Sequence, residues 1–419
     1  MTAKYTNDFN FISVTHKIFY FFLLYLPFEN YLPNTSIGLG INILNILILL
    51  LIVLTFTAKY KNNLADYTSY KCFKRIIIFF MSYTLLSSLL NSSDHGGVLE
   101  AITTWKRLYF IPIIFIVTYN ILQSDKQIRI SIGIMSFITL ISSIQVLRNT
   151  YDTSGAHYSD GLRYGGMFGP GGENDLAAFI AINLFWFLFW GRQAHQRWGK
   201  KLMLGMAGIT GLACLLCYSR GAYIALAAGL LYFSWKQNKN LLVMLVLMLL
   251  TIPAWAPKTV VERLDMLTQQ DQLDKDASAQ RRLIIWEGAR GMIADHLMFG
   301  VGPYNFGRQI HAYVHLPEDS PTASHNMYLR MTAELGIPGL LLFLMILWSF
   351  LKEGLLLSRE TQDWKGIWAV AYTASIISLI IVNIFGDRFF REELTGYVWV
   401  SGAIAFRLRS KHFKPASAL

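Results

Sequence analysis

The sequence predicts an all-α polytopic membrane protein with about twelve transmembrane helices. Three observations support this fold class. The 419 residues are 54% hydrophobic and only 15% charged, whereas soluble chains carry about 25% charged residues. The chain contains ten long stretches without a charged residue, and most of them approach the ~20 apolar residues that a helix needs to cross a bilayer core. Basic residues gather in every second connection between these gaps. These features exclude an ordinary soluble enzyme, a disordered tail and a disulfide-stapled secreted module.

The predicted spans follow the charge-free stretches in order. Ten such stretches occupy residues 30–58, 76–93, 108–124, 130–147, 176–191, 202–219, 221–235, 240–257, 335–351 and 366–386. Shorter apolar segments at 17–31 and 394–406 complete the set, because Lys17 and Arg407 can extend toward the headgroups. No small-residue cleavage site follows the first segment, so we expect a retained span and not a signal peptide.

The distribution of charge predicts the orientation of the spans. If both termini are cytoplasmic, most of the Lys and Arg residues fall in cytoplasmic connections, while most Asp and Glu residues fall on the other side. This asymmetry is the positive-inside pattern. The net charge of +11 therefore fits anionic lipid at the inner leaflet, and we expect no nucleic-acid partner.

The connections predict three regions. Residues 1–257 form an N-terminal transmembrane bundle of about nine spans, and residues 323–419 form a C-terminal bundle of about three. Between them, residues 258–322 form a long periplasmic loop in which 279–293 has helical periodicity. Residues 149–173 make a second long outer connection. Loops of this length are commonly functional, so the chemistry is expected on this outer face.

Three patterns resemble ligand sites but favour simpler interpretations. His311 and His315 stand one helical turn apart, yet no carboxylate or Cys follows at metal-ligand spacing, so we expect no metal and no cofactor. The Cys-x-x-Cys at 214–217 lies within an apolar span, where thiols usually serve as small packing residues. The Gly-rich segment 165–172 leads into Glu173, whose charge would repel a phosphate. We interpret this segment as a flexible loop that ends at a helix N-cap.

A few basic residues and one histidine on the outer face are the candidate site residues. Arg220 lies in a tight turn between two apolar stretches, and Arg281 and Arg282 begin the helical part of the long loop. Guanidinium groups bind phosphate oxygens in pairs and stay charged when partly desolvated. Headgroup contact for Arg220 and solvation of the Arg281–Arg282 pair are the simpler alternatives. His325 precedes a span, and an imidazole accepts protons near neutral pH, although most such histidines are structural.

Several motifs follow one another in the second half of the chain. They are Ser219-Arg220-Gly221-Ala222, Arg282-Leu283-x-x-Trp286, the segment from Phe299 to Phe306, His325-Asn326-x-Tyr328-Leu329 and Glu334-Leu335-Gly336-Ile337-x-Gly339. In this order and on the outer face, the set resembles the O-antigen ligase and O-antigen polymerase superfamily, also called Wzy_C-like.

The resemblance implies a fold similar to the GT-C class and a metal-independent, inverting membrane glycosyltransferase. It also implies a donor glycan linked to undecaprenyl diphosphate. Arg220 and Arg282 match the family's diphosphate-binding arginines, with Arg281 and Arg163 as further donor-binding candidates. His325 matches the catalytic histidine that acts on the acceptor hydroxyl. A Pro-Asn pair often seen in the family is absent here, where the chain reads Gly-Gly-Glu-Asn.

The expected function is an O-antigen ligase-like transfer of a glycan from undecaprenyl diphosphate to a hydroxyl of lipid A-core. The reaction is expected at the periplasmic face of a bacterial inner membrane, with membrane lipid as a further partner. A Wzy-type polysaccharide polymerase, using a glycan acceptor, and a protein O-oligosaccharyltransferase remain alternatives. A lipid-linked glycan transporter is more distant, because the sequence has no clear internal repeat and no row of ionisable residues at mid-span.

Overall fold

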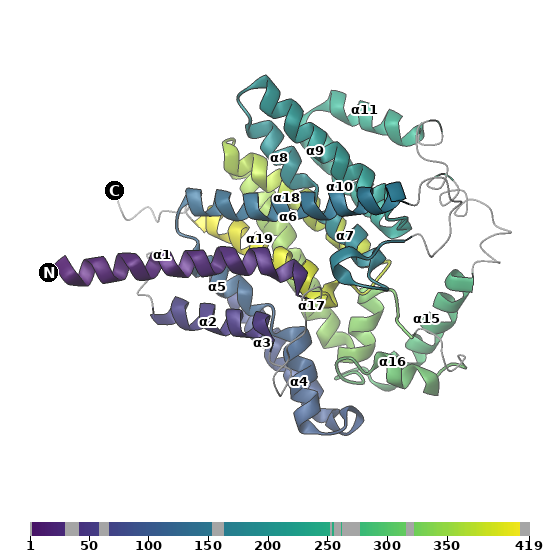
Figure 1. Ribbon diagram of the computed structural model, residues 1–419. Helices are drawn as coiled ribbons and strands as arrows, with labels where there is room; N and C mark the ends of the chain where they lie inside the picture. The colour runs from purple at the N-terminus through teal and green to yellow at the C-terminus, as the bar shows by residue number, and fades with distance from the viewer. Residues whose placement is uncertain are drawn as a thin grey trace.

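The structure described here is a computed structural model and covers most of the chain. It describes residues 2–29, 42–57, 67–152, 163–251, 254, 261, 277–315 and 322–410. These residues form α-helices and short 3-10 turns, and they contain no strand (Figure 1). The predicted all-α fold is therefore confirmed.

The helices are numbered as in Figure 1. They are α1 (Thr2–Tyr25), α2 (Ile43–Thr57), α3 (Thr68–Leu90), α4 (Val98–Tyr109), α5 (Ile113–Ile121), α6 (Asp125–Asp152), α7 (Glu173–Asn183), α8 (Phe185–Gln193), α9 (Arg197–Leu216), α10 (Arg220–Gln237), α11 (Lys239–Leu250), α15 (Ala277–Asp295), α16 (Phe306–Gln309), α17 (Met327–Glu360), α18 (Trp364–Val382) and α19 (Glu392–Ser410). Short 3-10 turns include η4 (Gly166–Phe168) and η6 (Arg388–Phe390).

Six helical segments in the described residues are long and apolar enough to cross a membrane. They are Thr68–Leu90, Asp125–Thr150, Glu173–Gln193, Arg197–Leu216, Met327–Glu360 and Trp364–Val382. Shorter apolar helices occupy Val14–Phe28 and Ile43–Thr57. These helices fit a polytopic membrane protein. One predicted span, 108–124, forms only the nine residues of α5, which rise about 14 Å and are too short to cross a core of about 30 Å.

The centre of the bundle is filled by large aromatic side chains. Trp186 stacks on Trp368 with ring centroids 6.1 Å apart, and Trp368 stacks on Tyr372 at 5.2 Å. Helices α10 and α18 approach closely because Gly229 faces α18, where a Cβ would lie 2.9 Å from the carbonyl oxygen of Ala374. This packing joins α7, α8, α10 and α18 into one core.

Helix α17 is interrupted at Gly336, which has φ 71° and ψ −177°. The interruption exposes carbonyl groups that the connection after α15 satisfies: Val301 N donates to Ala333 O, and Gly302 N donates to Glu334 O, both at 3.0 Å. Gly336 has no Cβ, and an added Cβ would lie 2.2 Å from the carbonyl oxygen of Met298. These contacts hold the connection after α15 against the interrupted part of α17.

Helix α15 lies outside the bundle with its own small core, which includes Ile285, Ala289, Met292 and Phe306 (Figure 1). The helical periodicity of 279–293 is confirmed by the observed span of 277–295. Most of the loop ahead of it, 258–276, and the stretch 316–321 lie outside the described residues.

The Gly-rich segment before α7 forms a compact turn, where the sequence suggested a flexible loop. Residues 166–168 make the 3-10 turn η4. A Cβ on Gly165 would lie 2.0 Å from the carbonyl oxygen of Gly169, and one on Gly172 would lie 2.4 Å from the Cβ of Phe168. This close backbone contact fixes the chain between Arg163 and the start of α7.

Candidate functional site

Charged side chains from separate segments converge at one end of the bundle. The segment before α17 carries His325, and the first part of α15 carries Arg282. Asp387 and Arg388 follow α18, and Asp175 lies in the first turn of α7. His325 lies within electrostatic reach of all four of these side chains. The structure therefore brings together residues that are far apart in the sequence.

Helix α15 is anchored beside His325 by a tryptophan. The Trp286 Nε1 donates a hydrogen bond of 2.8 Å to the carbonyl oxygen of Ser324. Because Trp286 lies one helical turn beyond Arg282, this bond holds the first part of α15 against the histidine's segment. Arg281 is half-buried in the same turn, but no contact among the described residues joins it to His325.

Arg220 lies at the first position of α10, beside the chain that leaves α18. Its neighbour Gly221 packs against Phe385, where a Cβ would lie 2.6 Å from the Phe385 Cβ. Phe385 comes two residues before Asp387, so Arg220 belongs to the same end of the bundle. Arg220 as a whole is half-buried.

Arg163 reaches this end from the turn before α7. Its Nη2 donates to the Oδ1 of Asn174 at 2.6 Å, and its Nε is buried without a hydrogen-bond partner in the described residues. Arg163 also acts electrostatically on Cys217, just beyond α9, as does Glu173. Arg163 thus lies between α7 and α9, beside the start of α10.

The structure adds an ion-pair network that the sequence did not reveal. Asp175, whose side chain is 3% exposed, binds both Arg388 and Arg391, with an Arg391 Nε–Oδ2 distance of 2.7 Å. Arg330 lies between two carboxylates, with its Nε 2.9 Å from the Glu334 Oε1 and its Nη1 2.9 Å from the Asp387 Oδ2. Three acids and three arginines of this network therefore pair with one another.

Asp387 links this network to the segment of His325. Its Oδ1 accepts a hydrogen bond of 2.8 Å from the Ser324 Oγ. Asn326 caps α17, since its Oδ1 accepts from Tyr328 N at 3.0 Å and Leu329 N at 3.1 Å. The histidine therefore lies between two anchored neighbours.

The imidazole of His325 is neutral at physiological pH. Burial lowers its pKa to about 4, with Arg282 as the next cause, while Asp387 acts in the opposite direction. A neutral imidazole has a lone pair that can accept a proton. The site therefore combines a neutral base with fixed positive charge.

Backbone strain gathers at the same end. Among the described residues, the positive-φ residues other than glycine are Tyr218, Tyr304 and His325, with φ values of 53°, 65° and 51°. Tyr218 comes two residues before Arg220, and the Tyr304 ring lies 5.5 Å from the Arg330 guanidinium. Such strain persists only where surrounding contacts impose it, and it clusters at functional sites.

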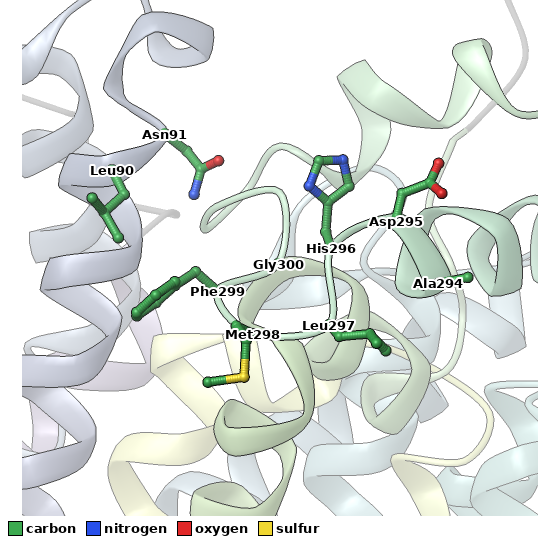
Figure 2. A pocket seen from close by; sticks show the side chains of 9 residues that line it. All are labelled: Leu90, Asn91, Ala294, Asp295, His296, Leu297, Met298, Phe299 and Gly300. Carbon is green, nitrogen blue, oxygen red and sulfur yellow. The ribbon is translucent and has the colours of Figure 1, made fainter.

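A recess of about 470 Å³ opens beside the connection after α15. Figure 2 shows the polar side chains of Asn91, Asp295 and His296 around its opening, with Phe299 and Met298 on the opposite side. The same connection continues through Gly300 to the break in α17. The recess therefore borders the site across one short loop.

Residues 205–344 match the family model of O-antigen ligase, Wzy_C. This match confirms the resemblance drawn from the motifs. It covers Arg220, Arg282, His325 and the α17 break at Gly336, so these parts of the candidate site lie within the O-antigen ligase region. Asp387 and its neighbours lie beyond it. No curated protein matches the chain.

The O-antigen ligase match and the apolar helices together indicate a multi-pass membrane enzyme of the O-antigen ligase or polymerase type. Within the described residues, no group of three or more His, Cys, Asp and Glu side chains is placed to hold a metal. The site offers arginines, which suit a phosphate-bearing ligand.

The sequence contained a weak signal for the residues that it missed. Asp175 and Asp387 are the charged residues that bound two predicted spans, 176–191 and 366–386. In the sequence analysis, these two residues were used only to define where an apolar stretch begins or ends. A carboxylate at the end of a buried span needs a partner, and two arginines, Arg388 and Arg391, follow Asp387 closely.

Proposed function

We propose that this protein is an O-antigen ligase-like glycosyltransferase. It moves a glycan from undecaprenyl diphosphate to a hydroxyl of lipid A-core at the periplasmic face of a bacterial inner membrane, with both termini cytoplasmic. The observation that carries the proposal is the neutral, half-buried His325 beside Arg282 within the region similar to O-antigen ligase. The charge asymmetry of the connections supports the orientation.

The proposed donor site is formed by arginines. Arg220 and Arg282 bind the diphosphate oxygens, with Arg163 and Arg281 as further donor-binding residues. Guanidinium groups match phosphate oxygens in geometry and stay charged on partial burial. The positive charge stabilises the negative charge that develops on the leaving diphosphate.

The proposed reaction is a single displacement without a metal. The acceptor oxygen attacks the anomeric carbon and forms the new glycosidic bond, while the bond from that carbon to the diphosphate oxygen breaks. His325 takes the hydroxyl proton, and the bonding electrons leave with undecaprenyl diphosphate. Attack opposite the leaving group inverts the anomeric centre. General-base catalysis of this kind contributes roughly 10²–10⁴-fold in rate.

A pKa of about 4 makes His325 a weak base before the donor binds. A bound diphosphate brings negative charge close to the imidazole and offsets the field of Arg282. Opposite charge nearby raises a histidine pKa. Donor binding therefore activates the base, which favours proton transfer only when the leaving group is in place.

The decisive experiment uses purified full-length protein, a lipid-linked glycan and three acceptors in parallel: lipid A-core, a second lipid-linked repeat and a pilin-like protein. We expect glycan transfer to lipid A-core. Transfer to the second repeat or to protein would instead identify a polymerase or a protein O-oligosaccharyltransferase. Gradient-driven transport without any glycan product would contradict the enzyme assignment altogether.

A variant pair tests the site. Arg282→Gln is expected to abolish most transfer, whereas Arg290→Gln, an exposed arginine on the same helix, is expected to leave it unchanged. Both proteins are first compared for membrane insertion and expression. Full activity of Arg282→Gln would remove the donor-site assignment.

A further inference from the structure

A second groove lies at the end of the bundle away from the candidate site. It has a volume of about 690 Å³ and is lined by residues of α6, α8 and α18. Helix α6 begins at this groove and leads toward Arg163, and α18 begins there and ends near Asp387. In Figure 1, α8 and α15 lie on opposite sides of the bundle. The groove and the site are therefore separated by the length of the spans.

The groove carries a positive charge. Lys126 is exposed, and Arg129 lies over the ring of Trp364, 4.4 Å from its centroid. The carboxylate that lines the groove, Asp125, is 3.6 Å from the Lys365 Nζ, which compensates its charge. The first turns of α6 and α18 add the partial positive charge of two helix N-termini. The side chain of the nearby Asp363 caps the start of α18, because its Oδ1 accepts a hydrogen bond of 2.9 Å from Lys365 N.

Two indoles and a glycine shape the groove. The Trp190 Nε1 donates to the Ser136 Oγ at 3.1 Å, which fixes that ring, and Trp364 is half-buried beneath Arg129. Tryptophan beside basic residues is typical of the membrane interface, where headgroups meet hydrocarbon. A Cβ on Gly133 would meet no atom within 4 Å, so the glycine leaves open space between the rings.

An apolar stripe leads away from the groove along α6. Ile130, Phe137 and Ile144 recur every seven residues and are 38%, 56% and 51% exposed. They lie on one face of a helix long and apolar enough to cross a membrane. The stripe spans about 21 Å at the rise of an α-helix, which exceeds half of the ~30 Å hydrocarbon core. A ligand that fills both features needs an anionic head and an apolar tail.

We propose that this groove binds an anionic phospholipid, with its phosphate between Lys126 and Arg129 and an acyl chain along the α6 stripe. The continuity of basic groove and apolar stripe favours a lipid over a free phosphate, which would gain nothing from the stripe. The inference is independent of the glycosyltransferase reaction, because it involves no residue of that site.

The test compares lipid retention by the full chain in nanodiscs. Protein is reconstituted with phosphatidylglycerol and phosphatidylcholine in equal amounts, and bound lipid is measured by native mass spectrometry after detergent exchange. We expect selective retention of phosphatidylglycerol by the unaltered protein. The double variant Lys126→Gln with Arg129→Gln should bind it about thirty-fold more weakly at low salt.

A matched control and a second variant keep the test decisive. Lys200→Gln with Lys201→Gln removes the same charge from α9 outside the groove, where Lys201 lies over Trp198, and should retain the lipid. Gly133→Leu keeps all charges but fills the groove, so it should also lose the lipid. Equal retention by all variants, or displacement of the lipid by millimolar inorganic phosphate, would overturn the proposal.

Discussion

The coupling between Arg282 and His325 gives the sharpest test of the site. The pKa of His325 is lowered from 6.5 to about 4, first by burial and next by Arg282. Arg282→Gln removes the second cause and keeps the first, so the pKa should rise but stay below its ordinary value. We expect the pKa to rise from about 4 while staying below 6.5, and each full unit of that rise is equivalent to ~1.4 kcal/mol.

The sign of this change fixes the expected pH dependence. His325 must be neutral to accept a proton, so the activity of the free enzyme falls as the pH decreases through the histidine pKa. In the unaltered protein the acid limb of kcat/KM is expected near pH 4. In Arg282→Gln the residual activity should show that limb at a higher pH, still below 6.5.

The assay follows the imidazole directly by NMR of the histidine-labelled protein between pH 3.5 and 8. The chain contains nine histidines, so the His325→Asn spectrum assigns the relevant signal. Arg290→Gln is the control, because it removes the charge of an exposed arginine on the same helix. An unchanged or lower His325 pKa in Arg282→Gln would refute the proposed coupling.

Three further outcomes are expected. His325→Ala should insert normally and lose roughly 10²–10⁴-fold in transfer rate; normal turnover would exclude it as the base. Asp387→Ala leaves Arg330 with one of its two carboxylates and should destabilise the protein by about 3 kcal/mol in thermal unfolding, whereas an unchanged midpoint would show that the pair is dispensable. Gly336→Ala should also destabilise the protein, because the φ of this residue is 71° and the new Cβ would meet the carbonyl oxygen of Met298. The control Gly205→Ala on α9 places a Cβ where it meets no atom, so it should be neutral or stabilising. Equal effects of the two substitutions on thermal unfolding would refute the packing argument.

The sequence predicted the features that depend on local composition. The charge-free stretches predicted the helical membrane fold, and the periodicity of 279–293 predicted the helix observed as α15. Arg282 and His325 were predicted as site residues from the order of the motifs, because no local pattern shows that two side chains distant in the sequence lie together. The family match includes both residues.

Other features depend on contacts between distant segments and were not predictable. The stretch 108–124 is apolar enough for a span, yet it yields the short α5, which begins after Pro112 and whose side chains are buried among neighbouring helices. Likewise, hydropathy shows that Asp175 borders an apolar stretch, but it does not predict that Arg388 and Arg391 lie beside this carboxylate. Such pairing is decided by tertiary packing, which hydropathy does not encode.

The network around Asp175 and Asp387 explains how arginines can be held in a partly desolvated site. Burying a guanidinium alone is costly, and a carboxylate partner offsets much of that cost. Arg388 and Arg330 have such partners, so they are fixed in position without needing a ligand. Arg220 and Arg282 lie at the same end of the bundle as this fixed frame, where we propose that the anionic donor binds. When the proposed diphosphate donor binds there, its negative charge also raises the pKa of His325 and makes the imidazole a better base.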